Sequence, residues 1–123
     1  MVKFFHDNPT NATRAVQIWQ ILVAKASNRQ TLTYGELAEL LEFGGAGVLN
    51  HPLGHIMRYC QQNGLPPLTV IVVNKDTGLP GGGLDVPPSE QNVAREKVFQ
   101  YPWFDIIPPD AEELKKAVLA GPK

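Results

Sequence analysis

Apolar residues recur with helical spacing near the start of the chain. They fall at positions i, i+3, i+4, i+7, i+8 and i+11, which is one face of an α-helix: Ala15, Ile18, Trp19, Leu22, Val23 and Ala26. Pro9, Thr10 and Asn11, just before this stripe, are typical of a helix start. The pattern therefore predicts a helix over about residues 12–27, with Trp19 anchored in the core.

Two further helices are predicted before the middle of the chain. The segment Thr33-Tyr34-Gly35-Glu36 has the form of a capping box and predicts a short helix over about residues 34–42. Its expected apolar face is Leu37, Leu40 and Leu41. The next helix is expected to start near Asn50 or His51 and to stop at Asn63-Gly64. Its expected inner face is Leu53, Ile56, Met57 and Cys60.

The second half of the chain mixes strand and helix signals. Residues 68–74 are rich in β-branched side chains and predict a buried strand, and residues 79–84 are expected to form a loop or a short returning strand. Helices are expected over about residues 89–99 and 111–119, and the apolar segment Tyr101–Phe104 is expected to cover the core.

Three helices followed by a hairpin are the winged-helix arrangement. We therefore predict a mainly α fold with a small β-hairpin, in a single domain over residues 1–123. Its winged helix-turn-helix core would span residues 11–84, and residues 85–123 would add a C-terminal helical segment.

Composition limits the classes of function. The 123 residues carry 11 Lys and Arg against 12 Asp and Glu, a net charge of −1, without the basic excess of a strong non-specific nucleic-acid binder. The single cysteine excludes an intramolecular disulfide and an all-cysteine zinc site. No wholly apolar run exceeds four residues, as at Val70–Val73, which is too short to span a membrane. The N-terminus has no signal-peptide pattern, so we expect a cytoplasmic protein.

One side of the predicted third helix carries polar residues three, four and seven positions apart. They are His51, Gly54, His55, Arg58 and Gln62. Such a face can donate hydrogen bonds to base edges and phosphates, and a glycine permits close backbone approach. A solvated polar helix face gives the same pattern, and both interpretations remain open.

Other chemistry finds little support in the sequence. His51 and His55 have a spacing that can hold zinc, but no third ligand is apparent, so we expect neither a metal site nor a cofactor. No catalytic constellation stands out. Residues 33–66 contain one basic residue, Arg58, against three acids, which are Glu36, Glu39 and Glu42.

Four motifs in order resemble one known family. They are Thr33-Tyr34-Gly35-Glu36-Leu37-Ala38, Pro52-Leu53-Gly54-His55-Ile56-Met57-Arg58, Asn63-Gly64-Leu65-Pro66-Pro67-Leu68 and Gly82-Gly83-Leu84. Over about residues 12–84 the chain is similar to the C-terminal winged-helix domain of alkylguanine-DNA alkyltransferases and to the non-enzymatic alkyltransferase-like proteins. The resemblance implies that Tyr34 presses on a DNA phosphate and helps to rotate a nucleotide out of the duplex.

The chain departs from this family at two functional positions. The arginine that fills the gap in the base stack is replaced by His51, Val48 or Gly54, depending on the motif from which the alignment starts. Ile71 stands at the position of the reactive cysteine, so the resemblance implies no alkyl transfer. Cys60 is expected to be buried and inert.

Two functions therefore remain as expectations. The first is a non-enzymatic module that binds double-stranded DNA and recognises modified or extrahelical bases. Its expected contact residues are Tyr34, His51, Gly54, His55, Arg58 and Gln62. The second is a protein-interaction or regulatory module that keeps the fold without binding DNA, with a partner contacting Tyr101–Phe104. Independently of these two functions, Tyr34 has an alternative interpretation as an ordinary aromatic residue at a helix start, packing on Phe43.

Overall fold

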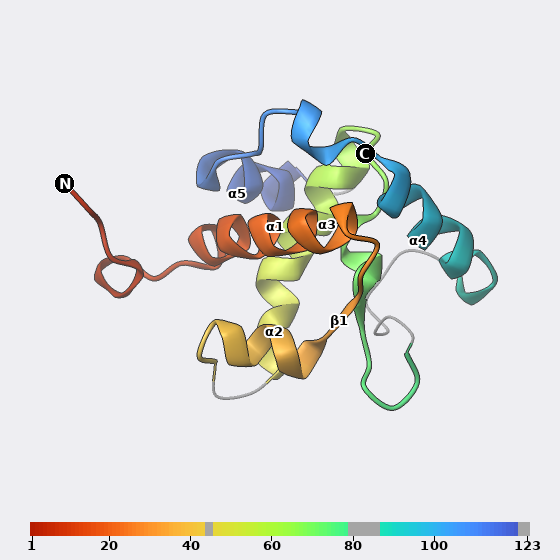
Figure 1. Cartoon of the computed structure of the whole chain (residues 1–123). Helices are drawn as coiled ribbons and strands as arrows, with labels where there is room; N and C mark the ends of the chain where they lie inside the picture. The colour runs from red at the N-terminus through yellow and green to blue at the C-terminus, as the bar shows by residue number, and fades with distance from the viewer. Residues whose placement is uncertain (44–45, 79–86, 121–123) are drawn as a thin grey trace.

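Five α-helices dominate the computed structural model, which describes residues 1–43, 46–78 and 87–120 (Figure 1). They are α1 (Asn11–Ser27), α2 (Tyr34–Leu40), α3 (Asn50–Gln62), α4 (Gln91–Gln100) and α5 (Ala111–Ala120). Short 3-10 helices lie between them: η1 (Phe5–Asp7), η2 (Ala46–Leu49), η3 (Leu68–Ile71), η4 (Pro88–Glu90) and η5 (Trp103–Asp105). The prediction of a mainly helical fold is confirmed. In these described ranges, no helix combines the length and the apolar character needed to cross a bilayer.

Helix α1 lies at the centre of the fold, as its apolar stripe predicts (Figure 1). It begins where the Thr10 hydroxyl accepts a hydrogen bond from the Thr13 backbone N–H at 3.0 Å. Its seven buried residues face α3, α5, α4 and η3. Trp19 is only 3% exposed, so the sequence-based expectation of a core anchor is confirmed.

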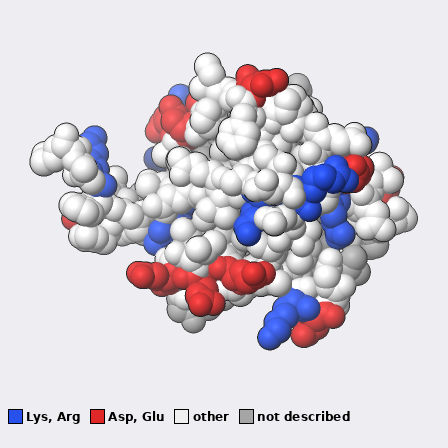
Figure 2. All heavy atoms as spheres, viewed as in Figure 1, with Lys and Arg blue, Asp and Glu red and all other residues white. Residues whose placement is uncertain are grey.

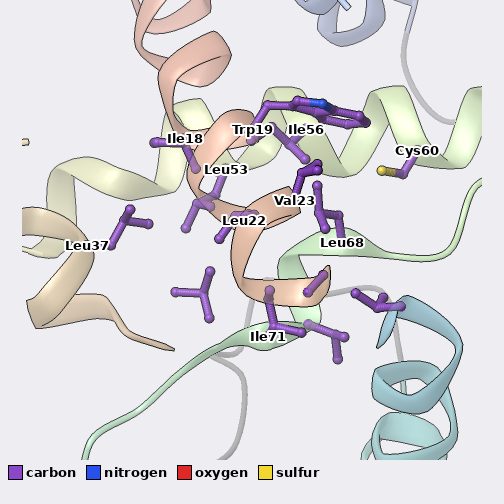
Figure 3. Packing of buried hydrophobic residues seen from close by; sticks show 14 of the residues in the cluster. Ile18, Trp19, Leu22, Val23, Leu37, Leu53, Ile56, Cys60, Leu68 and Ile71 are labelled. Carbon is purple, nitrogen blue, oxygen red and sulfur yellow. The ribbon is translucent and has the colours of Figure 1, made fainter. Parts of the chain in front are cut away.

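The core is continuous across the chain. Figure 3 shows side chains of α1, α2, α3 and the segment around Ile71 meeting in one cluster. Val98 of α4, Trp103 of η5 and Leu114 of α5 belong to the same cluster. The described part of the C-terminal segment is therefore built into the same core as the region that precedes it.

The predicted strand over residues 68–74 is wrong for most of its length. Residues 68–71 form η3, in which the Val70 N–H donates to the Pro67 carbonyl at 2.9 Å, and only β2 (Val72–Val73) is extended. This strand pairs in parallel with β1 (Leu32–Thr33), with Leu32 beside Val72. Within the described residues the small sheet is therefore a parallel pair and not a hairpin. The predicted returning segment, residues 79–84, lies outside the described residues.

Helix α2 buries a narrower face than its sequence predicts. Leu40 is 61% exposed, whereas Leu37 is fully buried and Leu41 is half-buried. The helix has only seven residues and ends at Leu40, and the chain then turns through a positive φ of 58° at Glu42. Met57 of α3 is likewise only half-buried, so the expected inner faces of both helices were too wide.

Candidate nucleic-acid interface on helix α3

Helix α3 separates buried and accessible residues by its own periodicity. Pro52, Leu53, Ile56 and Cys60 are buried against the core. On the opposite side His51 is exposed, and Gly54, His55 and Arg58 are half-buried. Residues three, four and seven positions apart share one side of a helix, so these four form a continuous surface. We call His51, Gly54, His55 and Arg58 the α3 ridge.

Two histidines of the ridge are joined through the backbone. The Nδ1 atom of His55 lies 2.7 Å from the carbonyl oxygen of His51, one turn earlier. Because a carbonyl oxygen only accepts, Nδ1 carries the proton in this contact. A ring that carries its single proton on Nδ1 has Nε2 free to accept a hydrogen bond, for example from an amino group on a base edge.

Gly54 lies in the middle of α3, and the space beside its Cα atom is open. A Cβ atom added there would meet no atom within 4 Å, so no close packing requires the absence of a side chain. Its backbone has ordinary helical geometry, because the positive-φ glycines of the described residues are Gly64 and Gly78. A glycine inside a helix costs about 1 kcal/mol of stability relative to alanine. The fold alone therefore gives no reason for glycine at this position.

The ridge ends at Arg58, because Gln62 has a structural contact. The Nε2 atom of Gln62 donates to the carbonyl oxygen of Ala117 on α5 at 2.7 Å. This hydrogen bond fastens the last turn of α3 to α5, and Gln62 is half-buried beneath it. The Nη1 atom of Arg58 donates to Oε1 of Gln61 at 3.0 Å, which holds the guanidinium along the helix.

Tyr34 begins α2, and its position is fixed by the predicted capping box. The Thr33 hydroxyl accepts from the Glu36 N–H at 3.0 Å, and the Glu36 carboxylate accepts from the Thr33 N–H at 2.9 Å. The backbone hydrogen bond of Thr33 is the main cause that lowers the pKa of Glu36. Tyr34 is half-buried and packs against the core. Helix η2 contacts both α2 and α3.

The exposed side of α2 is acidic. Glu36, Glu39 and Glu42 line a hollow of about 510 Å³ together with Leu32, Leu40 and a single cation, Lys25. Figure 2 shows acidic side chains gathered over this helix. Such a surface repels phosphate groups, so the body of α2 is unfavourable for contact with a nucleic acid.

The two positions considered for thiol chemistry are both inside the protein. Cys60 is 1% exposed and lies on the inner side of α3 (Figure 3), where burial raises the pKa of its thiol to about 12. Ile71, at the position that the resemblance gives to a reactive cysteine, is fully buried.

We expect Cys60 of the folded protein to be inert toward a thiol reagent such as dithiobis-nitrobenzoate. The thiolate is the reactive form, and burial both removes the thiolate and blocks access. In denaturant the same thiol should react at the rate of a free cysteine. Absorbance at mild alkaline pH measures both rates. Rapid stoichiometric reaction of the native protein would contradict this burial.

Two further sources of functional information are possible metal ligands and similarity to known proteins. Across residues 1–43, 46–78 and 87–120, no three His, Cys, Asp or Glu side chains gather as metal ligands. Comparison with protein-family models, with curated proteins and with solved structures found no match. The candidate interface therefore depends on its own geometry and on the motif resemblance.

Proposed function

We propose that the protein is a non-enzymatic DNA-binding module that contacts a duplex through the α3 ridge and Tyr34. Support comes from the order of motifs that resembles alkyltransferase-like proteins and from the accessible ridge on the helix that follows α2 and η2. Ile71 in place of a reactive cysteine and the buried Cys60 favour binding without alkyl transfer.

The observation that carries the proposal is Gly54. This glycine lowers helix stability, and no packing contact with the residues that the structure describes explains it. It shares the accessible side of α3 with His51, His55 and Arg58. A residue without a side chain there lets the helix backbone approach a base edge or a phosphate closely. Binding to a surface thus gives a reason for Gly54 that folding does not.

The neighbouring residues take distinct parts in this proposal. The Nε2 atom of His55 accepts from the amino group of adenine or cytosine, and Arg58 donates to a phosphate. Following the resemblance, Tyr34 presses on the DNA backbone, and His51 stands near the vacancy that an extrahelical base leaves. The lone arginine of the ridge and the acidic α2 predict weak, salt-sensitive binding. The resemblance implies a preference for duplexes with modified or extrahelical bases.

We expect Gly54→Ala to raise stability and lower DNA affinity together. Alanine should add about 1 kcal/mol to the free energy of unfolding, and its methyl group should weaken duplex binding by about tenfold through lost approach. Urea unfolding measures the first effect, and fluorescence anisotropy with paired and alkylated-guanine duplexes measures the second. Gly54→Ala with unchanged affinity would show that the ridge is only a solvated face.

A charge-matched pair of variants locates the contact. Arg58→Ala should reduce the slope of log affinity against log salt by about one unit, measured between about 50 and 200 mM salt. Lys97→Ala removes an exposed cation on α4 and should leave the slope unchanged. Equal effects of the two variants would mean that binding is non-specific, and no wild-type binding at low salt would end the DNA proposal.

A protein-interaction role is the second candidate, and one observation favours it. Trp103 is 2% exposed, but its neighbour Phe104 is 74% exposed and Ile107 is 88% exposed. Exposed large apolar side chains close together along a chain are typical of partner surfaces. A wild-type protein that fails to bind any duplex would give this second role precedence.

A further inference from the structure

Two aromatic rings lie against one arginine at the edge of the fold. The guanidinium carbon of Arg14 lies 3.6 Å from the ring centroid of Phe5 and 4.8 Å from that of Phe43. Phe5 belongs to η1, and Phe43 follows α2. The Nη1 atom of Arg14 donates to Oε1 of Gln17 at 2.6 Å, which fixes the plane of the guanidinium.

The partial burial of Arg14 is energetically unfavourable for its guanidinium group. Its Nε atom is buried, and no hydrogen-bond partner for it lies within residues 1–43, 46–78 and 87–120. Desolvation lowers the pKa of Arg14, and the charge of Glu42 partly opposes that effect. A buried donor without a partner destabilises the state that buries it, so covering Arg14 is not the most favourable arrangement for that group.

The segment that covers Arg14 is held by few other contacts. Helix η1 buries none of its three residues. In the described chain, the backbone hydrogen bonds of residues 4–8 stay inside that segment, as do the Phe4–His6 ring contact and the His6–Asp7 ion pair. Figure 1 shows this N-terminal segment projecting from the body of the protein. The Phe5–Arg14 contact is therefore its main described attachment.

We propose that η1 is a removable cover, and that Phe5 occupies on Arg14 and Phe43 the position of an unstacked nucleobase. Bases stack on aromatic rings and on guanidinium planes. The uncovered site would present the guanidinium face of Arg14 with the ring of Phe43 beside it. This inference rests on the proposed DNA-binding function.

The test uses a short duplex with one bulged 2-aminopurine, whose fluorescence falls when the base stacks. Phe5→Ala should bind this duplex at least about fivefold more tightly than the wild type and quench its fluorescence more strongly. Affinity for the fully paired duplex should not change. Phe5 lies in a segment without buried residues, so the variant keeps its fold, which circular dichroism verifies.

Two controls separate the cover from a general effect. Phe4→Ala removes an exposed ring that stacks on His6 at 5.6 Å, and it should behave as the wild type. Arg14→Lys in the Phe5→Ala background keeps the charge and removes the planar face, so the gain should disappear. A gain that survives Arg14→Lys would assign the effect to another site.

The outcomes distinguish this inference from the proposed function. If the wild type binds paired DNA and Phe5→Ala matches Phe4→Ala on the bulged duplex, the cover is refuted and DNA binding stands. If only Phe5→Ala binds, and only the bulged duplex, the cover stands and binding of paired duplexes by the ridge fails. If no variant binds either duplex, both ideas fail.

Discussion

Replacing Trp103 with alanine is expected to lower the free energy of unfolding by about 3–5 kcal/mol. The indole of Trp103 is 2% exposed and packs edge-on against Trp19, with ring centroids 5.6 Å apart. Its Nε1 atom donates to the carbonyl oxygen of Val98 at 2.8 Å. The substitution removes the apolar burial and the ring contact and leaves that carbonyl without its partner.

The adjacent residue provides the control for this experiment. Phe104 is 74% exposed, and Phe104→Ala should change the free energy of unfolding by no more than about 0.5 kcal/mol. Urea unfolding followed by circular dichroism measures both variants. Similar losses at both positions would mean that η5 is held differently from the arrangement described. The pair of variants also tests the protein-interaction role, because Phe104→Ala should weaken the binding of a protein partner without unfolding the chain.

Leu114→Ala is expected to cost about 2–5 kcal/mol, because it removes the fully buried anchor of α5. Helix α5 packs on both α1 and α3, and the Gln62–Ala117 hydrogen bond lies at the same contact. Weakening α5 should therefore loosen the last turn of α3. In hydrogen-exchange measurements, Leu114→Ala should increase the exchange rate of α3 amides near Gln62 relative to the wild type. The increase should be larger there than in the central turns of α1.

A second leucine of the same helix is the matched control. Leu119 is 77% exposed, and Leu119→Ala removes the same atoms without removing buried surface. Its effect on urea unfolding should stay within about 0.5 kcal/mol. If Leu114→Ala proved equally mild, α5 would not be a part of the core.

Local signals predicted the helices well. The apolar stripe located α1 to within one residue at its start, and the capping box located the first residue of α2. Both signals depend on residues within one or two turns of each other. The sheet could not be predicted in this way. Strand β1 has only two residues, and Leu32 pairs with Val72, which lies 40 positions later in the sequence.

The candidate site was predictable only in part. Helical periodicity placed His51, Gly54, His55 and Arg58 on one side, as the structure has them. The same periodicity added Gln62, and only the docking of α5 shows that its amide binds Ala117. No sequence signal marked the ring contacts of Arg14, because Phe5 and Phe43 approach it from two separate segments.

The contact between α1 and α5 also bears on how the chain folds during synthesis. The first helix is released from the ribosome long before Leu114 and Ala117, which cover part of its apolar stripe. Until then that stripe is incompletely shielded, and exposed apolar surface promotes aggregation of nascent chains. We therefore expect this protein to reach its native state only after α5 has become available to pack on α1.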